Sequence, residues 1–411
     1  MADGIHTAER AATQGIDGGP TAFVLGGGGA RAAYQAGVLR GIARQHPDLH
    51  IPIFTGTSAG AINAAFIAGH RAPFATAAAE LVALWQSLTP ERVFRVGAGS
   101  LGRNVMRWGW RLLSGGLGTG EHTRGLVDTA PLMDLLREGL SARDDGMIAG
   151  IEQNVASGRL GAIALSATSY STGQSTTWVA GRDIALWQRP QRRSEVVRLG
   201  VEHVMASAAL PLLFPAVRVG NEWYGDGGIR LTAPLSPAVH LGAARILTIA
   251  TRYQRTRDEA DVSQIVGYPP PAQVLGVLYN AIFLDQIDED IRRLELVNRL
   301  LAELRDGNRA GRRTVDMLVI RPSRDLGRLA REYEPRLPGA FRFLTRGLGT
   351  RRTASPDVLS MLMFQHDYVS ALVELGEQDA AVHQERIALF LKGSVRLWSP
   401  AGAARAAGIG A

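Results

Sequence analysis

Short apolar runs and helical repeats alternate in the first part of the chain. The run Thr21–Leu25 is apolar and ends in four glycines, which predicts a buried strand that leads into a glycine loop. Residues 30–45 then carry apolar side chains at helical spacing, and a second short run at 51–55 precedes an alanine- and isoleucine-rich helix over 58–69. Two strand–helix units in succession predict the opening of a parallel α/β sheet.

Weaker patterns extend this fold toward residue 267. The irregular segment 95–120 combines glycine, arginine and tryptophan, and we interpret it as a short helix and a mobile loop. The other elements expected here are helices over 73–87, 130–157 and near 195–207, and strands at 160–166, 175–179, near Val217, near Trp223 and at 246–250. The pattern predicts an α/β fold with three layers, α/β/α, around a mostly parallel central sheet.

The pattern of apolar and polar residues changes after residue 267. Three prolines mark the break, and residues 274–304 then place apolar side chains on one face of a long amphipathic helix. A strand at 315–320 is expected to rejoin the sheet, and the rest is helical to about residue 393. We therefore divide the chain into a flexible tail over 1–19, a main α/β domain over 20–267 and a mainly helical C-terminal region over 268–411.

Composition limits the chemistry that the chain can use. Hydrophobic residues make up 46% and charged residues 20% of the chain, so it can bury a sizeable core. Cysteine is absent, which excludes disulfides, thiolate metal sites and a cysteine nucleophile. The net charge is +7, and nearly the whole excess falls in 321–352, which holds nine arginines and three acidic residues. This segment is either a solvated surface or a site for anionic lipid headgroups. No nucleic-acid partner is expected.

The sequence predicts a protein of the cytoplasm. The first 20 residues lack the apolar core of a signal peptide, and no run approaches the roughly 18 apolar residues of a membrane span. Any membrane contact should therefore be peripheral. Besides 321–352, the segment 101–117 suits a lipid interface or a lid, because Trp108 and Trp110 lie among spaced arginines. The same segment could instead be a helix packed on the core.

The first motif that carries chemistry is the pentapeptide G-x-S-x-G around Ser58. Its glycines, Gly56 and Gly60, allow a sharp turn between a strand and a helix, so that a serine hydroxyl stands at the helix N-terminus. The free amides there favour negative charge. The strand expected before the motif and the helix expected after it supply this geometry. Ser58 is therefore a candidate nucleophile, and a purely structural turn is the alternative.

The second motif is the glycine loop that follows the first strand. Successive amides of Gly27, Gly28 and Gly29 can point toward one spot and form an oxyanion hole. The loop also matches the dinucleotide fingerprint G-x-G-x-x-A, which requires an acidic residue at the end of the next strand. Asp48 lies before that strand instead. The oxyanion hole is therefore the favoured interpretation.

A serine nucleophile needs a proton acceptor, and no histidine is suitably placed. His240 lies in a helical stretch before a predicted strand, and His366 lies on a late amphipathic helix. A carboxylate is the remaining choice. Asp226 follows a short aromatic strand, and the next two residues, Gly227 and Gly228, permit close backbone approach. We expect Asp226 in a half-buried cleft that raises the pKa of its carboxyl, although a role in the turn alone is the alternative.

Together these motifs resemble the patatin-like phospholipase family. That family combines a G-G-G-x-R/K-G loop, a G-x-S-x-G elbow and a later D-G-G or D-G-A aspartate. The matching residues are Gly27, Gly28, Gly29 and Arg31; Gly56, Ser58 and Gly60; and Asp226 with Gly227 and Gly228. Ala32 stands where the family often has glycine. The likeness covers about residues 20–250, so 20–267 is the expected catalytic domain.

The resemblance implies a patatin-like fold and a lipid acyl hydrolase with a Ser–Asp dyad. Ser58 would attack a phospholipid or another fatty-acyl ester, Asp226 would accept its proton, and amides of Gly27–Gly29 would hold the oxyanion. Arg31 could pair with a phosphate or with a carboxylate. No cofactor and no metal are expected, since the acidic residues at 285–290 fit a solvated helix face. The alternatives are an acyltransferase with the same acyl-enzyme and a non-catalytic lipid- or nucleotide-binding protein.

Overall fold

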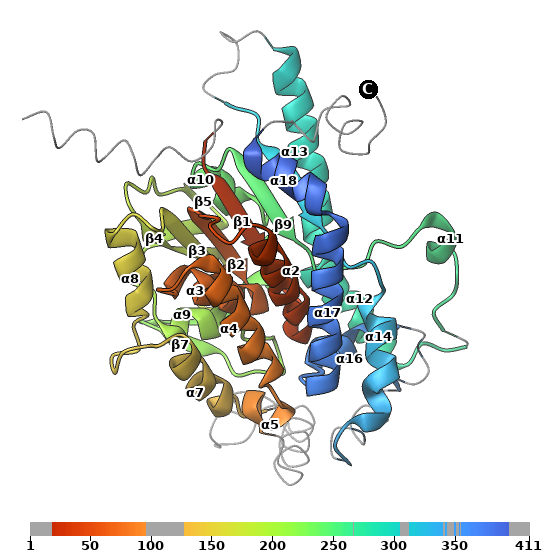
Figure 1. The fold of residues 1–411 in the computed structure, drawn as a ribbon. Coiled ribbons are helices and arrows are strands. Elements are labelled where there is room, and N and C mark those ends of the chain that lie inside the picture. The colour runs from red at the N-terminus through yellow and green to blue at the C-terminus, as the bar shows by residue number, and fades with distance from the viewer. Residues whose placement is uncertain are drawn as a thin grey trace, which may run out of the picture.

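A computed structural model describes residues 19–95, 127–265, 267–304, 312–339, 342, 349–350, 353 and 355–393. This part of the chain forms three layers, with helices on both faces of one central sheet (Figure 1). The predicted α/β/α fold is thereby confirmed. The segment 101–117 lies outside the described residues, so its place at a lipid interface stays a prediction.

The central sheet is mostly parallel. In spatial order it consists of β10 (Asp316–Ile320), β9 (Arg245–Ile249), β1 (Thr21–Leu25), β2 (Ile53–Thr57), β3 (Ala162–Ser169), β4 (Ser175–Gly181), β6 (Arg192–Val196) and β5 (Gln188–Arg189). The run from β10 to β3 is parallel throughout, and β4 pairs with β3 in the antiparallel direction. β8 (Glu222–Asp226) pairs with the end of β3, and β7 (Val217–Val219) pairs with β8.

The two faces of the sheet carry separate clusters of apolar side chains, because helices cover both of them. In β1, Phe23 and Leu25 belong to the larger cluster, whereas Ala22 and Val24 belong to the smaller one. The larger cluster includes residues of α2 (Ala32–Gln45), α3 (Ala59–Gly69), α4 (Phe74–Gln86), α5 (Pro90–Val93), α7 (Ala130–Gly139), α8 (Ala149–Ala156), α9 (Val201–Ser207), α14 (Leu326–Tyr333), α16 (Asp357–Leu362), α17 (His366–Val382) and α18 (Gln384–Lys392). The smaller cluster includes residues of α10 (Ser236–His240) and α13 (Asp285–Glu303).

α2 is buried along nearly its whole length, because α17 covers the side that the sheet leaves free (Figure 1). The two helices approach backbone to backbone. A methyl group on Gly37 would lie 2.1 Å from the carbonyl oxygen of Val373, and one on Gly376 would lie 2.3 Å from that of Tyr34. These glycines are therefore required by close packing, and the C-terminal region forms part of the same three-layer body.

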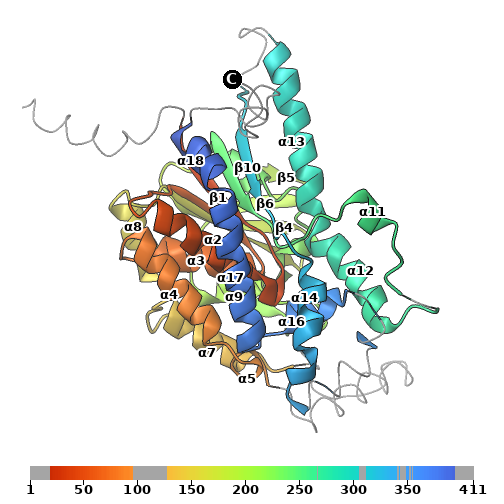
Figure 2. The same ribbon diagram turned by 45° about the vertical axis from the view of Figure 1, so that its right-hand side comes forward.

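The amphipathic stretch predicted over 274–304 is two helices. α12 (Pro271–Phe283) and α13 meet at a corner at Leu284, and α13 extends away from the sheet (Figure 2). Leu284 is 3% exposed, and the corner turns it inward together with Ile287 of α13. The hydrophobic period alone could not reveal this corner, because both helices keep the same spacing of apolar residues.

Residues near 195–207 also differ from the predicted helix. Arg192–Val196 forms β6, which pairs with β4, and only Val201–Ser207 is helical. Pairing with a neighbouring strand has overridden the local pattern.

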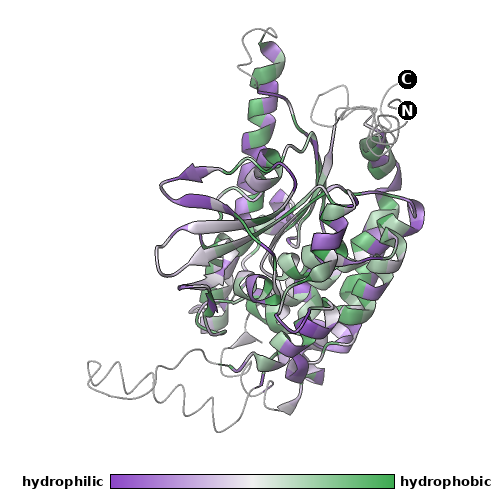
Figure 3. Cartoon of the chain, turned by 90° about the vertical axis from the view of Figure 1, so that its left-hand side faces the viewer, coloured by the Kyte–Doolittle hydropathy of each residue, from purple (hydrophilic) through white to green (hydrophobic). Residues whose placement is uncertain are grey.

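The shorter elements are η1 (Gly29–Arg31), η2 (Gly227–Ile229), α11 (Arg257–Ala260) and η4 (Glu334–Arg336). Hydrophobic and hydrophilic residues alternate around the helices (Figure 3), and none of the described helices could cross a membrane.

Candidate active site

Ser58 lies on a strained turn between β2 and α3. Its backbone has φ 57° and ψ −135°, a region that non-glycine residues rarely occupy. The flanking glycines are needed because other backbone comes close. A methyl group on Gly56 would lie 2.6 Å from Ala61 Cα, and one on Gly60 would lie 2.1 Å from the carbonyl oxygen of Leu25. The turn is therefore the predicted strand–elbow–helix.

The register of β3 brings Ser58 and Asp226 together. β2 stays paired with β3 up to Thr57, which lies opposite Ser166. β8 joins β3 one residue further on, where Asp226 lies opposite Ala167. The residue after β2 and the last residue of β8 therefore meet, and Ser58 Oγ donates a hydrogen bond of 2.6 Å to Asp226 Oδ2.

The Asp226 carboxyl is fully buried, at 0% exposure, so the expected half-buried cleft was wrong. Burial raises the pKa of the Asp226 carboxyl to about 7, although hydrogen bonds from Ser58 Oγ and from the amide of Gly228 lower it. The Thr168 hydroxyl donates to the backbone carbonyl of Asp226 at 2.8 Å and fixes the strand end. A carboxylate with a pKa near neutrality is a better proton acceptor than a solvated aspartate.

Ser207 supports the elbow from α9. Its hydroxyl accepts a hydrogen bond of 3.0 Å from the amide of Ser58 and donates one of 2.6 Å to the carbonyl of Ser166. The elbow is thus attached to both α9 and β3. Nothing in the local sequence marks Ser207, because its partners belong to other elements.

The glycine loop lies against Ser58. A methyl group on Gly27 would lie 3.0 Å from Ser58 Cβ, and Gly28 and Gly29 adopt φ of 149° and 57°, which favours glycine. The buried hydroxyl of Thr251, just after β9, donates a hydrogen bond of 2.6 Å to the Gly27 carbonyl. Because the carbonyl and amide of a trans peptide point in opposite directions, the Gly28 N–H points away from Thr251. No described group accepts from the amides of Gly28 or Gly29.

Two buried amide side chains hold the base of this loop. Gln35 Nε2 donates to the carbonyls of Gly26 at 2.9 Å and Ile249 at 3.0 Å. Asn63 Nδ2 donates to Gln35 Oε1 at 3.0 Å, and Trp85 Nε1 donates to Asn63 Oδ1 at 2.7 Å. The chain of hydrogen bonds links the ends of β1 and β9 to α2, α3 and α4.

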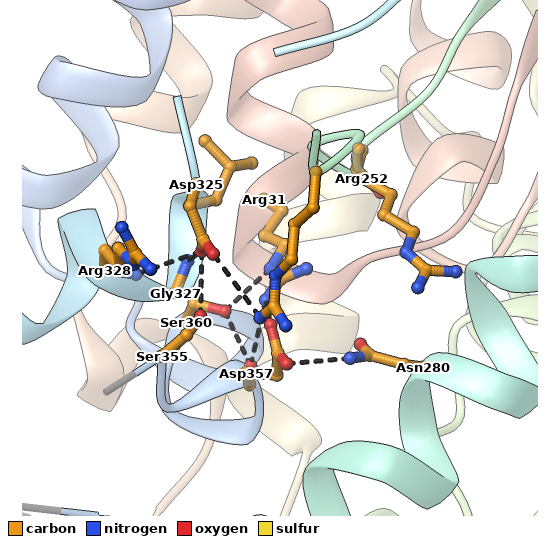
Figure 4. Close-up of polar contacts among 12 residues, drawn as sticks. Arg31, Arg252, Asn280, Asp325, Gly327, Arg328, Ser355, Asp357 and Ser360 are labelled. Carbon is orange, nitrogen blue, oxygen red and sulfur yellow. Dashed lines mark hydrogen bonds and ion pairs between the residues drawn. The ribbon is translucent and has the colours of Figure 1, made fainter. Parts of the chain in front are cut away.

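The Arg31 side chain contacts the C-terminal region (Figure 4). It is 3% exposed, and its guanidinium donates to Ser360 Oγ at 2.7 Å and to Asp357 Oδ1 at 2.5 Å. The other oxygen of Asp357 accepts from Asn280 Nδ2 at 2.7 Å. Of the two partners considered for Arg31, the structure therefore has the carboxylate. The same network ties the glycine loop to α16 and α12.

An apolar cavity opens beside Ser58. The space between its walls amounts to about 520 Å³ when open solvent is included. It lies among α3, α4, α7 and α9 on the larger-core face of the sheet. Its walls are apolar apart from Ser58 itself, and they include Ile62, Trp85, Leu132 and Phe214. The apolar lining suits a hydrocarbon chain.

The histidines considered from the sequence lie elsewhere. The His240 ring stacks on Trp187 with 4.6 Å between centroids, and His366 Nδ1 lies 2.6 Å from the Gln86 carbonyl. Among the described residues, no histidine forms a hydrogen bond with Ser58 or Asp226.

The arginine-rich segment 321–352 is described only in part. Its arginines Arg321, Arg324 and Arg336 form ion pairs with Asp288, Glu332 and Asp367, respectively. Part of the positive charge of this segment is therefore matched by acidic partners within the chain.

The fold and the site define an α/β protein in which a serine at a strand–helix elbow is hydrogen-bonded to a buried aspartate. The chain belongs to the patatin-like phospholipase family, whose model matches residues 23–239. No curated protein gives a significant match.

Among solved structures, the chain is similar to VipD from Legionella pneumophila, with 12% identity and a TM-score of 0.30 over 88% of this chain and 67% of that chain. It is also similar to human GIVD cytosolic phospholipase A2 in complex with methyl gamma-linolenyl fluorophosphonate, with 11% identity and a TM-score of 0.44 over 95% of this chain and 61% of that chain. For the type III effector ExoU the identity is 14% and the TM-score 0.30, over 88% of this chain and 54% of that chain. The chain thus spans less than two thirds of the phospholipase A2 and ExoU chains.

Proposed function

We propose that this protein hydrolyses fatty-acyl carboxylic esters, with Ser58 as the nucleophile and Asp226 as its base. The observation that supports this most is the 2.6 Å hydrogen bond between the Ser58 hydroxyl and the buried Asp226 carboxyl. Family membership supports a lipid ester hydrolase in general. The apolar cavity beside Ser58 suits the acyl chain of such an ester.

In the first step, Ser58 Oγ attacks the ester carbonyl carbon while its proton passes to Asp226 Oδ2. The carbonyl electron pair moves to the oxygen, and amides of the Gly27–Gly29 loop stabilise the resulting oxyanion. When the tetrahedral intermediate collapses, the bond to the alcohol breaks. The alcohol leaves with the proton from Asp226, and an acyl-enzyme remains on Ser58.

In the second step, water replaces the alcohol. Asp226 accepts a proton from the water as its oxygen attacks the acyl carbonyl, and the same amides hold the second oxyanion. Collapse breaks the bond to Ser58 Oγ, which recovers the proton from Asp226. The products are a free fatty acid and the original enzyme, so no cofactor is consumed.

The test combines p-nitrophenyl butyrate hydrolysis with intact-mass detection of a fluorophosphonate adduct. Wild type should gain one adduct and release acid without an added acceptor. Ser58→Ala and Asp226→Asn should lose turnover by on the order of a thousandfold or more while circular dichroism shows them folded. Asp144→Asn, an exposed aspartate, is the matched control and should keep full activity. Full activity in Ser58→Ala would overturn the proposal, and product only with an added acceptor would indicate an acyltransferase.

We also propose peripheral contact with lipid surfaces through 101–117 and 321–352. Spaced arginines in both segments support it, together with the tryptophans of the first. Sedimentation with vesicles should show more binding to anionic than to zwitterionic lipid, and high salt should weaken it. Equal binding to both kinds of vesicle would contradict this role for the arginines.

A further inference from the structure

A second apolar cavity lies on the other side of the glycine loop. The space between its walls amounts to about 520 Å³ when open solvent is included, as it does for the cavity beside Ser58. Gly27 and Gly228 both line it. Gly27 is the loop residue that lies against Ser58, and the amide of Gly228 donates to Asp226. The second cavity therefore begins next to both members of the dyad.

The two cavities extend along opposite faces of the sheet. The first is lined by Ile62 and Phe214, which belong to the larger apolar core. The second is lined by Val24 and Ile287, which belong to the smaller core. The sheet separates these cores, so the cavities come near each other only at its carboxyl edge, around the glycine loop.

The corner between α12 and α13 forms the outer wall of the second cavity. Ile282, Phe283, Leu284 and Ile287 from this corner line it, and Leu231 lies on the side of the Asp-Gly-Gly segment. Phe283 packs so closely that a methyl group on Gly228 would lie 2.4 Å from its ring. The C-terminal region therefore supplies one wall of a cavity whose other residues include Gly27, Thr57 and Gly228 of the three motifs.

A polar cavity adjoins the second one at Arg252, which lines both. The side chains of Arg31, Arg255, Asn280 and Asp357 line this larger space, and Figure 4 shows three of them together with Arg252. Two apolar spaces thus adjoin the glycine loop, and the polar space adjoins Arg31, which follows this loop. A glycerophospholipid has the same division, with two hydrocarbon chains and one polar headgroup, whereas a lysophospholipid has one chain.

We propose that the cavity beneath the α12–α13 corner holds the uncleaved chain of a two-chain lipid, whose other chain lies beside Ser58. This inference rests on the proposed function, because it extends the same site to a substrate class. It follows that a diacyl phospholipid with its headgroup toward Arg252 is a better substrate than the corresponding lysophospholipid.

The test compares kcat/KM for dioleoyl phosphatidylcholine and 1-oleoyl lysophosphatidylcholine in detergent mixed micelles. Wild type should favour the diacyl lipid. Ile282→Trp places an indole in the second cavity and should lower the diacyl-to-lyso ratio by about tenfold, the cost of modest overpacking. Gln286→Trp enters the same cavity from α13 and should act in the same direction. Leu132→Trp fills the cavity beside Ser58, so it should slow both lipids and leave the ratio unchanged.

Leu296→Trp is the matched control, because Leu296 lies on α13 but is 52% exposed. It should leave both rates and their ratio unchanged. The inference is overturned if wild type favours the lysophospholipid, or if Ile282→Trp and Gln286→Trp both keep the wild-type ratio while circular dichroism shows them folded. Failure of the proposed function looks different, because p-nitrophenyl butyrate would then not be hydrolysed, or Ser58→Ala would hydrolyse it.

Discussion

At the scale of single residues, the burial of Asp226 should control how activity depends on pH. Burial raises the pKa of its carboxyl to about 7, and only the ionised form can accept the Ser58 proton. We therefore expect kcat/KM for p-nitrophenyl butyrate to fall about tenfold per pH unit below this value. Circular dichroism across the range would exclude unfolding. A profile that stays flat down to pH 5 would contradict the role of Asp226 as the base.

The same pKa predicts a stability effect of the opposite sign. A carboxyl whose folded-state pKa lies above its unfolded value of 3.8 stabilises the fold when protonated, and this stability is lost as pH rises toward 7. Asp226→Asn removes the buried charge. Thermal unfolding should therefore show a higher Tm for Asp226→Asn than for wild type at pH 8, and a smaller difference at pH 4. Equal differences at both pH values would mean that burial of the charge is not the cause.

Thr251 should affect the rate through its hydrogen bond to the glycine loop. Its hydroxyl fixes the Gly27–Gly28 peptide, so Thr251→Val leaves the Gly27 carbonyl unpaired and the Gly28 amide less well oriented. We expect kcat to fall by about ten- to a hundredfold with little change in KM, because oxyanion donors act mainly in the transition state. Thr251→Ser keeps the hydroxyl and is the matched control. The role fails if the serine and valine variants have equal kcat.

Local motifs pointed to Ser58 and Asp226, which are hydrogen-bonded in the structure, but not to the residues that hold them in place. Ser58 and Asp226 are recognisable because their glycine neighbours are contiguous in sequence and serve sharp turns. Thr251, Ser207 and Gln35 carry no such mark, because each acts through a hydrogen bond to a distant segment. Such roles depend on which strands and helices become neighbours, and a single sequence does not display that.

At the scale of elements, the link between η1 and α16 should couple stability to activity. Arg31 is almost fully buried, so Asp357→Asn leaves its guanidinium without a charged partner. The free energy of unfolding should fall by up to about 3–5 kcal/mol. The glycine loop would also lose its attachment to α16. We expect a lower free energy of unfolding, measured in urea, together with a lower kcat.

The matched control is Asp367→Asn, which breaks the exposed ion pair between Asp367 and Arg336. Exposed pairs contribute about 0–1 kcal/mol, so this variant should stay close to wild type. Coupling between Arg31 and Asp357 can be measured with Arg31→Met and the double variant. Additive effects of the two substitutions would mean that the pair is not what holds the loop.

The order and type of most helices and strands could be predicted from the sequence. The prediction failed where contacts with distant parts of the chain determine the local structure. The first strands and helices follow their hydrophobic period closely. The break at Leu284 and the strand β6 do not, since each depends on what the segment packs against. The acidic stretch 285–290 is similar: a solvated face was expected, yet Asp290 is buried and accepts a hydrogen bond of 2.8 Å from the Leu235 amide. Acidic residues on a helix do not reveal which loop lies beside them.

At the scale of the whole molecule, the C-terminal region completes both the fold and the site. β10 extends the sheet beside β9, and α17 covers α2. Residues of α12 and α16 line the cavities near the glycine loop. The family model ends at residue 239, before all of these elements. The three motifs could therefore be recognised in the sequence, but the sequence did not show which elements enclose them.

A chain ending at residue 267 should consequently neither fold stably nor hydrolyse esters. Four residues of α17, Tyr368, Val369, Leu372 and Val373, are fully buried. Their loss costs roughly 6–12 kcal/mol at about 1.5–3 kcal/mol each, against a typical stability of about 5–15 kcal/mol. Circular dichroism, limited proteolysis and p-nitrophenyl butyrate turnover would measure the outcome. A chain ending at Gly393 keeps every described helix and should behave as wild type. A stable, active 1–267 fragment would show that the C-terminal region is a separable addition.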